Sequence, residues 1–211
     1  MVKIYSIDAN IGAGKSMLLH KIKQTLQNSN VVFLQEPVDK WSTFTDKGGE
    51  SILTKFYRDQ QKYSFQFQMM AYISRLASIR QMVRNHPDAI IISERSVFTD
   101  RNVFAQMLYD DGKLSEIEFK IYNEWFHEFI RDLPLDGIIF LNVDVNTTYQ
   151  RIQQRNRTGE NEIPIDYLEQ CDQYHKKWIN NTSTPVLTIE YSEDGFDKLP
   201  TIINSIKEFI Q

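Results

Sequence analysis

The stretch Asp8-Ala9-Asn10-Ile11-Gly12-Ala13-Gly14-Lys15-Ser16 decides the fold predicted for this chain. It follows a short strand-like run at residues 3–7 and leads directly into a helix-like segment. Small residues let backbone N–H groups turn inward around a polyphosphate, the lysine reaches the outer phosphates, and the serine hydroxyl can bind magnesium. The N-terminus of the next helix adds its positive dipole end. The stretch is therefore predicted to be a phosphate-binding loop.

An ordinary glycine-containing turn between a strand and a helix is the alternative for this stretch. The consensus loop has glycine where this chain has Ala9. Alanine is tolerated there if its φ stays below zero, while Gly12 and Gly14 supply freedom where the loop bends most. What the protein does with a bound phosphate has to be inferred from other residues.

Composition favours one compact unit. The chain has 211 residues with 41% hydrophobic content, which predicts a single domain over residues 1–211. A net charge of −4 argues against a general binder of nucleic acid polymers or anionic membranes. The single cysteine, Cys171, excludes an internal disulfide, and the four histidines lack zinc-ligand spacing. Without a membrane-length apolar run or a signal peptide, we expect a soluble cytoplasmic protein.

Apolar strand-like runs alternate with longer helix-like segments, which predicts an α/β fold with a five-stranded parallel sheet flanked by helices. The predicted strands are residues 3–8, 31–35, 89–93, 137–143 and 185–190. The predicted helices are residues 15–28, 63–85, 97–109, 115–132, 146–155, 164–180 and 198–210. The polar segment 41–50 is predicted to be a loop.

Charged residues follow the predicted strands at the sheet edge where such folds bind ligands. Glu36 comes after the second strand and can take a proton from a substrate hydroxyl, or it only caps a turn. Glu94 and Arg95 come after the third strand, beside the phosphate-binding loop. Glu94 can act on magnesium and Arg95 on a carboxylate or a developing phosphoryl charge, although a structural ion pair is the alternative.

The helix from Tyr63 repeats apolar residues at helical spacing, so one of its faces is predicted to be core. Gln68 and Arg75 lie seven residues apart and share a face with Ala71. A glutamine amide can pair with a flat heterocycle that offers a donor and an acceptor, although a solvated glutamine is the commoner case.

Three arginines, Arg151, Arg155 and Arg157, lie on or near one side of a helix end. Clustered guanidinium groups suit a phosphoryl group in transfer, where charge spreads over several oxygens. A solvated basic face would look similar, and the loop at Lys15 is what favours the functional interpretation.

Four ordered blocks of the chain resemble the deoxyribonucleoside kinase family, the group that contains deoxycytidine and deoxyguanosine kinases. The blocks read IDANIGAGKS, EPVDKW, ERSVFTDRNVFA and RIQQRNRTGENEIPIDYL, and the resemblance runs from Ile4 to about Phe209. It implies a nucleotide-binding kinase fold with an arginine-rich lid, ATP as phosphoryl donor, Mg²⁺ as cofactor, a deoxynucleoside as substrate and a homodimer.

The resemblance also implies roles for individual residues. Glu36 would be the general base on the 5′-hydroxyl, steadied by Arg95. ATP would be bound by Asn10, Ile11, Gly12, Ala13, Gly14, Lys15, Ser16, Arg151, Arg155, Arg157, Asp194 and Phe196. Mg²⁺ would be bound at Ser16 and Glu94. The substrate would contact Glu36, Trp41, Phe56, Tyr57, Gln68, Ala71, Arg75, Arg95, Asp100, Phe104 and Glu160.

Base preference is expected to depend on Arg75 and Asp100, because the resembled deoxycytidine and deoxyguanosine kinases carry this pair. The pair implies a preference for deoxycytidine or a purine deoxynucleoside over thymidine. A nucleoside monophosphate kinase of the thymidylate type is one alternative, but it would need more basic groups for the acceptor phosphate. A GTP-binding switch protein is another, although the chain has no Asn-Lys-x-Asp run for guanine recognition.

Aromatic residues also repeat at roughly helical spacing in the segment 115–132, as Phe119, Tyr122, Trp125, Phe126 and Phe129. Such a stripe is either core or a dimer face, and core is the expectation for most of its members.

Overall fold

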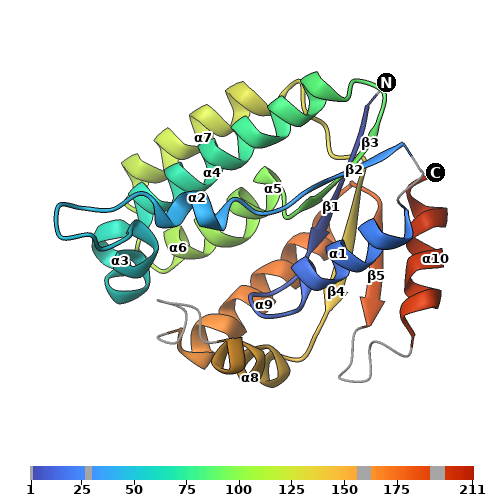
Figure 1. Ribbon diagram of the computed structural model, residues 1–211. Helices are drawn as coiled ribbons and strands as arrows, with labels where there is room; N and C mark the ends of the chain where they lie inside the picture. Colours follow the sequence, from blue (N-terminus) through green and yellow to red (C-terminus); the bar gives the residue numbers. More distant parts are fainter. Residues whose placement is uncertain (1, 27–29, 156–162, 191–197) are drawn as a thin grey trace.

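The computed structural model describes residues 2–26, 30–155, 163–190 and 198–211. Five strands form one parallel sheet: β1 (Lys3–Asp8), β2 (Val31–Leu34), β3 (Ile90–Glu94), β4 (Gly137–Asn142) and β5 (Val186–Glu190). Their order in the sheet is β2-β3-β1-β4-β5, which places β1 at the centre (Figure 1). All five carboxyl ends therefore meet at one edge, with the ends of β1 and β3 side by side.

Helices cover the sheet on both sides (Figure 1). They are α1 (Lys15–Thr25), α2 (Val38–Ser42), α3 (Ile52–Arg58), α4 (Gln60–Asn85), α5 (Val97–Thr99), α6 (Gln106–Asp110), α7 (Glu116–Ile130), α8 (Val145–Arg155), α9 (Ile165–Asn181) and α10 (Leu199–Phe209), with a π-helical segment η1 (Asp100–Ala105) between α5 and α6.

The core has two parts because successive residues of a strand point to opposite faces of the sheet. Ile7 of β1 belongs to the apolar cluster that packs under α1 and α10. Ile4, also of β1, belongs to the cluster formed with α4, α7 and α9. Burial of both clusters is what fixes the sheet between its two helical layers.

The predicted sheet is confirmed, with each strand boundary within one residue of the observed one. The helices predicted from residues 115, 146, 164 and 198 are also observed, displaced by at most two residues at either end. The N-terminus of α7 has a capping box, in which the Ser115 hydroxyl accepts from the Glu118 backbone and the Glu118 carboxylate accepts from the Ser115 N–H.

Two short helices were not predicted. Trp41 and Ser42, assigned to a loop, belong to α2, and the polar turn after them is closed by an isolated antiparallel bridge between Thr45 and Ser51. Helix α3 has seven residues, too few to show a helical repeat in a sequence. The single helix predicted over 97–109 is instead a succession of α5, η1 and α6. Asp100 and Phe104 of η1 both line the same cleft.

Among the helices in the described ranges, none combines the length and apolarity needed to cross a membrane.

Candidate active site

A cleft of about 730 Å³ opens at the carboxyl edge of the sheet. Its floor is formed by the loop after β1 and by the ends of β2 and β3, and its walls come from α2, α3, α4, η1, α8 and α9. This is the edge at which open α/β sheets bind ligands. Residues far apart in the chain meet here because the ends of β1 and β3 are neighbours in the sheet.

The loop between β1 and α1 bends at Gly12 and Gly14, the two positions at which the sequence predicts the freedom of glycine to be used. Gly12 and Gly14 have φ of 80° and 96°, in the left-handed region. Gly12 is also tightly packed, since a Cβ there would come within 2.5 Å of the Thr148 carbonyl oxygen. Ala9, at the position of a consensus glycine, is fully buried and has no positive φ, so the alanine fits without backbone strain.

Lys15 and Ser16 begin α1 at the mouth of this loop. The Lys15 ammonium is buried and donates to the Asn10 carbonyl oxygen at 2.9 Å. Burial, helped by the nearby Arg95, lowers the pKa of Lys15 to about 7. The Ser16 hydroxyl donates to Glu94 Oε1 at 2.7 Å, so the two predicted magnesium-binding side chains are in contact. Hydroxyl and carboxylate oxygens are suitable ligands for Mg²⁺.

A buried charged cluster fills the centre of the cleft. The Arg75 guanidinium donates to Asp100 at 2.8 and 3.3 Å, to Glu36 Oε1 at 2.7 Å and to the Glu94 carbonyl oxygen at 3.0 Å. Four of the five N–H donors of Arg75 are thus used by partners within the described residues. Asp100 and Arg75 are only 2% and 3% exposed, so they form a true buried ion pair.

Glu36 is the member of this cluster that faces the open cleft, with 16% of its side chain exposed. Burial alone would raise its pKa, but the positive charges of Arg75, Arg95 and Lys15 lower the pKa of Glu36 to about 2. The nearest Arg95 nitrogen lies 3.5 Å from Glu36 Oε1. Glu36 is therefore ionised at neutral pH and positioned by two guanidinium groups.

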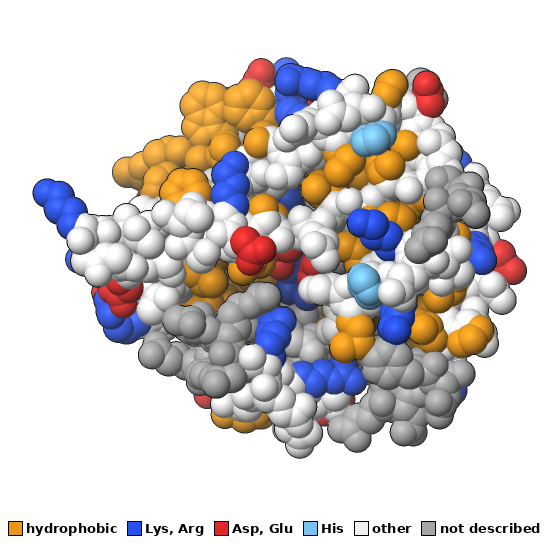
Figure 2. All heavy atoms as spheres, in the orientation of Figure 1, with side chains coloured by type: hydrophobic (Ala, Val, Ile, Leu, Met, Phe, Trp, Pro, Cys, Tyr) orange, Lys and Arg blue, Asp and Glu red, His pale blue; other side chains and the backbone are white. Residues whose placement is uncertain are grey.

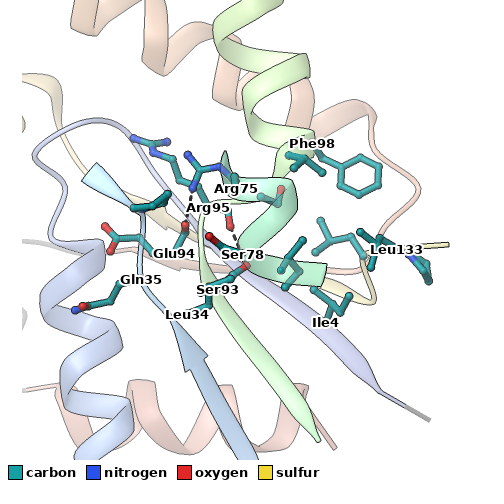
Figure 3. Close-up of a pocket in the computed structure, with 16 residues that line it drawn as sticks. Ile4, Leu34, Gln35, Arg75, Ser78, Ser93, Glu94, Arg95, Phe98 and Leu133 are labelled. Carbon is teal, nitrogen blue, oxygen red and sulfur yellow. Dashed lines mark hydrogen bonds between the residues drawn. The ribbon is translucent and has the colours of Figure 1, made fainter. Parts of the chain in front are cut away.

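A second, much smaller cavity of about 30 Å³ lies behind the charged cluster (Figure 3). Arg75, Glu94 and Arg95 lie at one end of it. Ile4, Phe98 and Leu133 line the other end. Its volume suffices for only one or two water molecules. The charges are thus backed by a mainly apolar wall, which keeps bulk water on the open side of the cleft.

Aromatic rings form the outer wall of the cleft. Phe56 and Phe67 stack with centroids 4.4 Å apart, and Trp41 meets Phe67 edge to face at 5.8 Å. Gln68 and Ala71, one and four residues further along α4, line the same wall and are buried. A flat apolar slot with one buried amide can hold a planar heterocycle and identify its edge.

Helix α8 brings arginines to the loop side of the cleft. Arg151 Nη1 donates to the Ala13 carbonyl oxygen at 3.3 Å, and Arg155 lines the cleft as well. Arg157, Glu160, Asp194 and Phe196 lie outside the described residues. Their predicted roles in ATP binding and substrate binding stay predictions.

The structure brings most of the predicted residues into this one cleft. They are Ile11, Gly12, Gly14, Lys15, Ser16, Glu36, Trp41, Phe56, Tyr57, Gln68, Ala71, Arg75, Glu94, Arg95, Asp100, Phe104, Arg151 and Arg155. Asn10 and Ala13 differ, because their side chains do not line it. The Asn10 amide donates to the Leu168 carbonyl oxygen at 2.8 Å and so ties the loop to α9, while Ala13 is packed in the core.

Several lining residues were missed by the sequence interpretation, among them Val38, Leu53, Phe67, Gln154 and Tyr167. Phe67 precedes Ala71 by one helical turn, so its position on the α4 face was a usable signal. Tyr167 had no such signal. It reaches the cleft from α9, and its ring lies 6.4 Å from that of Tyr57 in an edge-to-face arrangement.

Comparisons with known proteins agree with this geometry. The family model described as "Deoxynucleoside kinase" matches residues 5–211. Deoxycytidine kinase of Homo sapiens is 33% identical over 239 residues, covering 99% of this chain and 91% of the relative. A fowlpox virus protein named "Probable deoxycytidine kinase" is 34% identical over 219 residues, covering 99% and 88%. Mitochondrial deoxyguanosine kinase of Xenopus laevis is 30% identical over 225 residues, covering 98% and 82%.

Proposed function

The chain belongs to the deoxynucleoside kinase family, and from this we propose that it transfers the γ-phosphoryl group of ATP to the 5′-hydroxyl of a deoxyribonucleoside. The observation that carries the proposal is the shared cleft. It joins a glycine-containing loop with Lys15 and Ser16 to an ionised carboxylate, Glu36, beside an aromatic slot. We further propose that residues 1–211 act as one kinase domain.

Glu36 is the proposed general base and positioning group for the acceptor hydroxyl. Its low pKa keeps it ionised, and the hydrogen bond from Arg75 holds it at the cleft surface. A weak base suffices, because phosphoryl transfer has a loose transition state in which positioning and charge stabilisation supply most of the rate. Arg95, 3.5 Å from the same carboxylate oxygen, is the proposed partner for the developing phosphoryl charge.

The donor side is proposed to use the loop and α8. Bound ATP and Mg²⁺ would supply the transferable phosphoryl group and neutralise its negative charge. Lys15 would contact the phosphates and Ser16, with Glu94, would hold the metal, directly or through water. Arg151 and Arg155, with Arg157 beyond the described residues, are proposed to form a lid over the phosphates.

Deoxycytidine or a purine deoxynucleoside is the proposed preferred acceptor, ahead of thymidine. Gln68 can pair with a base that offers both a donor and an acceptor. Thymine also offers both, so the preference rests on the Arg75–Asp100 pair, in which one remaining N–H of Arg75 can donate to a ring nitrogen or carbonyl. The bulk of the paired guanidinium would also crowd the space that a thymine methyl group needs.

A phosphorylation panel tests the proposal directly. The four deoxynucleosides and their monophosphates are each supplied with ATP and Mg²⁺, and product is quantified by chromatography. Phosphorylation of nucleosides is expected, with deoxycytidine or a purine ahead of thymidine. Exclusive use of monophosphates would favour the thymidylate-kinase alternative. Stable GTP binding without any phosphorylation of small molecules would favour a switch protein.

The role of Glu36 has its own test. Glu36→Gln is expected to lower kcat by about 10²- to 10⁴-fold, the usual contribution of a general base, while the protein still folds. Asp39→Asn is the matched control, because Asp39 is a cleft-lining carboxylate outside the charged cluster. A Glu36→Gln rate equal to the wild-type rate would exclude the base role.

We also propose a homodimer formed through α7 and α4. Ile117, Ile121 and Trp125 recur every four residues on α7 and are 71%, 41% and 45% exposed, and Ile73 of α4 is 43% exposed. Figure 2 shows hydrophobic side chains gathered at the upper left over these helices. The aromatic residues predicted as core or dimer face are thus divided between the two, because Tyr122 and Phe126 of α7 are buried while Trp125 is exposed. Light scattering should give twice the chain mass for the wild type and the single mass for Trp125→Glu.

The proposed location is the cytoplasm of a cell or of a virus-infected host. Cys171, the single cysteine of the chain, is fully buried and forms no disulfide, which suits such a compartment. Fractionation of expressing cells, with the protein followed by immunoblot, checks this location.

A further inference from the structure

His175 of α9 lies next to Arg95, and no sequence motif includes it. Its side chain is fully buried. Its Nδ1 atom lies 2.6 Å from the Cys171 carbonyl oxygen, and its Nε2 atom lies 3.2 Å from Arg95 Nη1. The imidazole therefore connects the backbone of α9 to the guanidinium that faces Glu36.

The hydrogen-bond partners determine the protonation of this ring. A carbonyl oxygen can only accept, so Nδ1 carries the proton and donates to Cys171. Burial, together with the charge of Arg95, lowers the pKa of His175 well below its usual value, so the ring is neutral. Its Nε2 lone pair is then available, and Arg95 Nη1 donates to it.

Arg95 is also held by its backbone conformation and by its other neighbours. Its φ is 61°, in the left-handed region, where a residue with a side chain is normally disfavoured. The guanidinium lies 4.8 Å from the centre of the Phe104 ring and 3.5 Å from Glu36. The His175 ring is itself packed edge to face on Phe104 and stacked on Phe140, with centroids 5.9 and 6.3 Å away.

We propose that His175 is a positioning residue, whose Nε2 atom orients the Arg95 guanidinium toward Glu36 and the phosphoryl group in transfer. The inference rests on the proposed kinase function. His175 does not touch the substrate. It acts by removing the rotational freedom of Arg95 before the substrate binds, without adding another positive charge to the site.

Two amide variants separate positioning from simple packing. In His175→Asn the amide can still donate to the Cys171 carbonyl, but it is too short to offer an acceptor at the Nε2 position. In His175→Gln the longer side chain restores an acceptor near that position. Both variants lose the ring contacts with Phe104 and Phe140, and they differ from each other by one methylene group and by the reach of the amide.

Steady-state kinetics with deoxynucleosides, ATP and Mg²⁺ are measured for both variants. His175→Asn is expected to lower kcat by about tenfold or more, with a smaller change in KM, because a hydrogen bond to a charged group is lost in the transition state. His175→Gln is expected to recover most of kcat. In an Arg95→Lys background the two variants should have equal kcat. The inference is overturned if His175→Asn and His175→Gln lower kcat equally in the wild-type background as well as in the Arg95→Lys background. A wild-type rate for His175→Asn would also overturn it.

A spectroscopic readout distinguishes failure of this inference from failure of the proposed function. In protein labelled with ¹⁵N-histidine, the His175 signal, identified by its loss in His175→Asn, should show a protonated Nδ1 and an unprotonated Nε2 that shifts in Arg95→Lys. A protonated Nε2 would overturn the contact whatever the activity. If the wild type phosphorylates no deoxynucleoside, the proposed function is refuted and positioning in that reaction is refuted with it. An active wild type with an unaffected His175→Asn refutes only the present inference.

Discussion

Removing both partners of the buried ion pair between Arg75 and Asp100 should destabilise the protein no more than removing either partner alone. Each partner is almost completely buried, and the two are joined by hydrogen bonds of 2.8 and 3.3 Å. Asp100→Ala leaves the guanidinium buried with Glu36 as its remaining carboxylate. Arg75→Met leaves Asp100 buried without its cation and also removes the closest positive partner of Glu36.

The magnitude follows from the behaviour of buried pairs. Loss of one partner costs about 3 kcal/mol for Asp100→Ala and about 4 kcal/mol for Arg75→Met, in the range found when a buried charge is left uncompensated. The double variant removes both charges and should lose only about 3 kcal/mol, mainly through Glu36. The expected coupling free energy is therefore about 4 kcal/mol, well above the additive limit for independent sites.

Urea unfolding of the wild type, both single variants and the double variant measures this coupling. Glu128→Ala and Arg131→Met form the control cycle, since this pair is exposed on both sides and should couple by less than about 0.5 kcal/mol. Additive losses at Arg75 and Asp100 would refute the reasoning. The double variant should also raise the ratio of kcat/KM for thymidine to that for deoxycytidine by about tenfold, because the loss of Arg75 removes one hydrogen bond from a charged donor to the base of deoxycytidine. An unchanged ratio would refute the proposed specificity role.

Three further outcomes are expected. Gly12→Ala should weaken ATP binding, measured by calorimetry, by about tenfold or more, because its Cβ would meet the Thr148 carbonyl oxygen at 2.5 Å. Gly112→Ala is the control: Gly112 also has a positive φ but open space around it, so ATP binding should be unchanged. ATP binding at pH 8.5 should take up about one proton, since the pKa of Lys15 is about 7 in the free protein and a bound polyphosphate raises it. Calorimetry in buffers of different ionisation enthalpy measures the uptake, and Lys15→Arg should abolish it. The folded pKa of Glu36, about 2, lies below its unfolded value, so the contribution of Glu36 to stability is present above about pH 4.5 and lost as pH falls toward 2. The free energy of unfolding, measured by urea unfolding, should therefore fall less steeply over this pH window in Glu36→Gln than in the wild type.

The sheet was predictable because its evidence is local. Runs such as residues 89–92 are short, continuous and apolar, which suits strands covered by helices on both faces. The long helices were predictable for the same reason, since α4 and α9 repeat their apolar residues over several turns. Helices α2 and α3 are too short for a repeat, and the π turn at η1 does not change which residues are apolar.

Much of the candidate site was also predictable, because chemistry-bearing residues follow strands whose ends must meet. Glu36 and Glu94 lie just after or at the end of a strand, and Lys15 closes the loop that follows β1. Contacts between elements were not predictable in this way. Tyr167 and His175 both reach the site from α9, and a histidine without ligand spacing is most simply interpreted as a packing residue.

The sequence by itself determined the α/β architecture, the loop at residues 8–16 and the identity of most charged groups in the cleft, since each depends on neighbours along the chain. Only the tertiary structure decided how those charges are shared: that Arg75 binds both Asp100 and Glu36, that Ser16 contacts Glu94, and that His175 stands behind Arg95. Such pairings depend on strand order and helix packing, which bring together groups that lie between 25 and 80 residues apart in the chain. Burial then converts that proximity into shifted pKa values and fixed orientations.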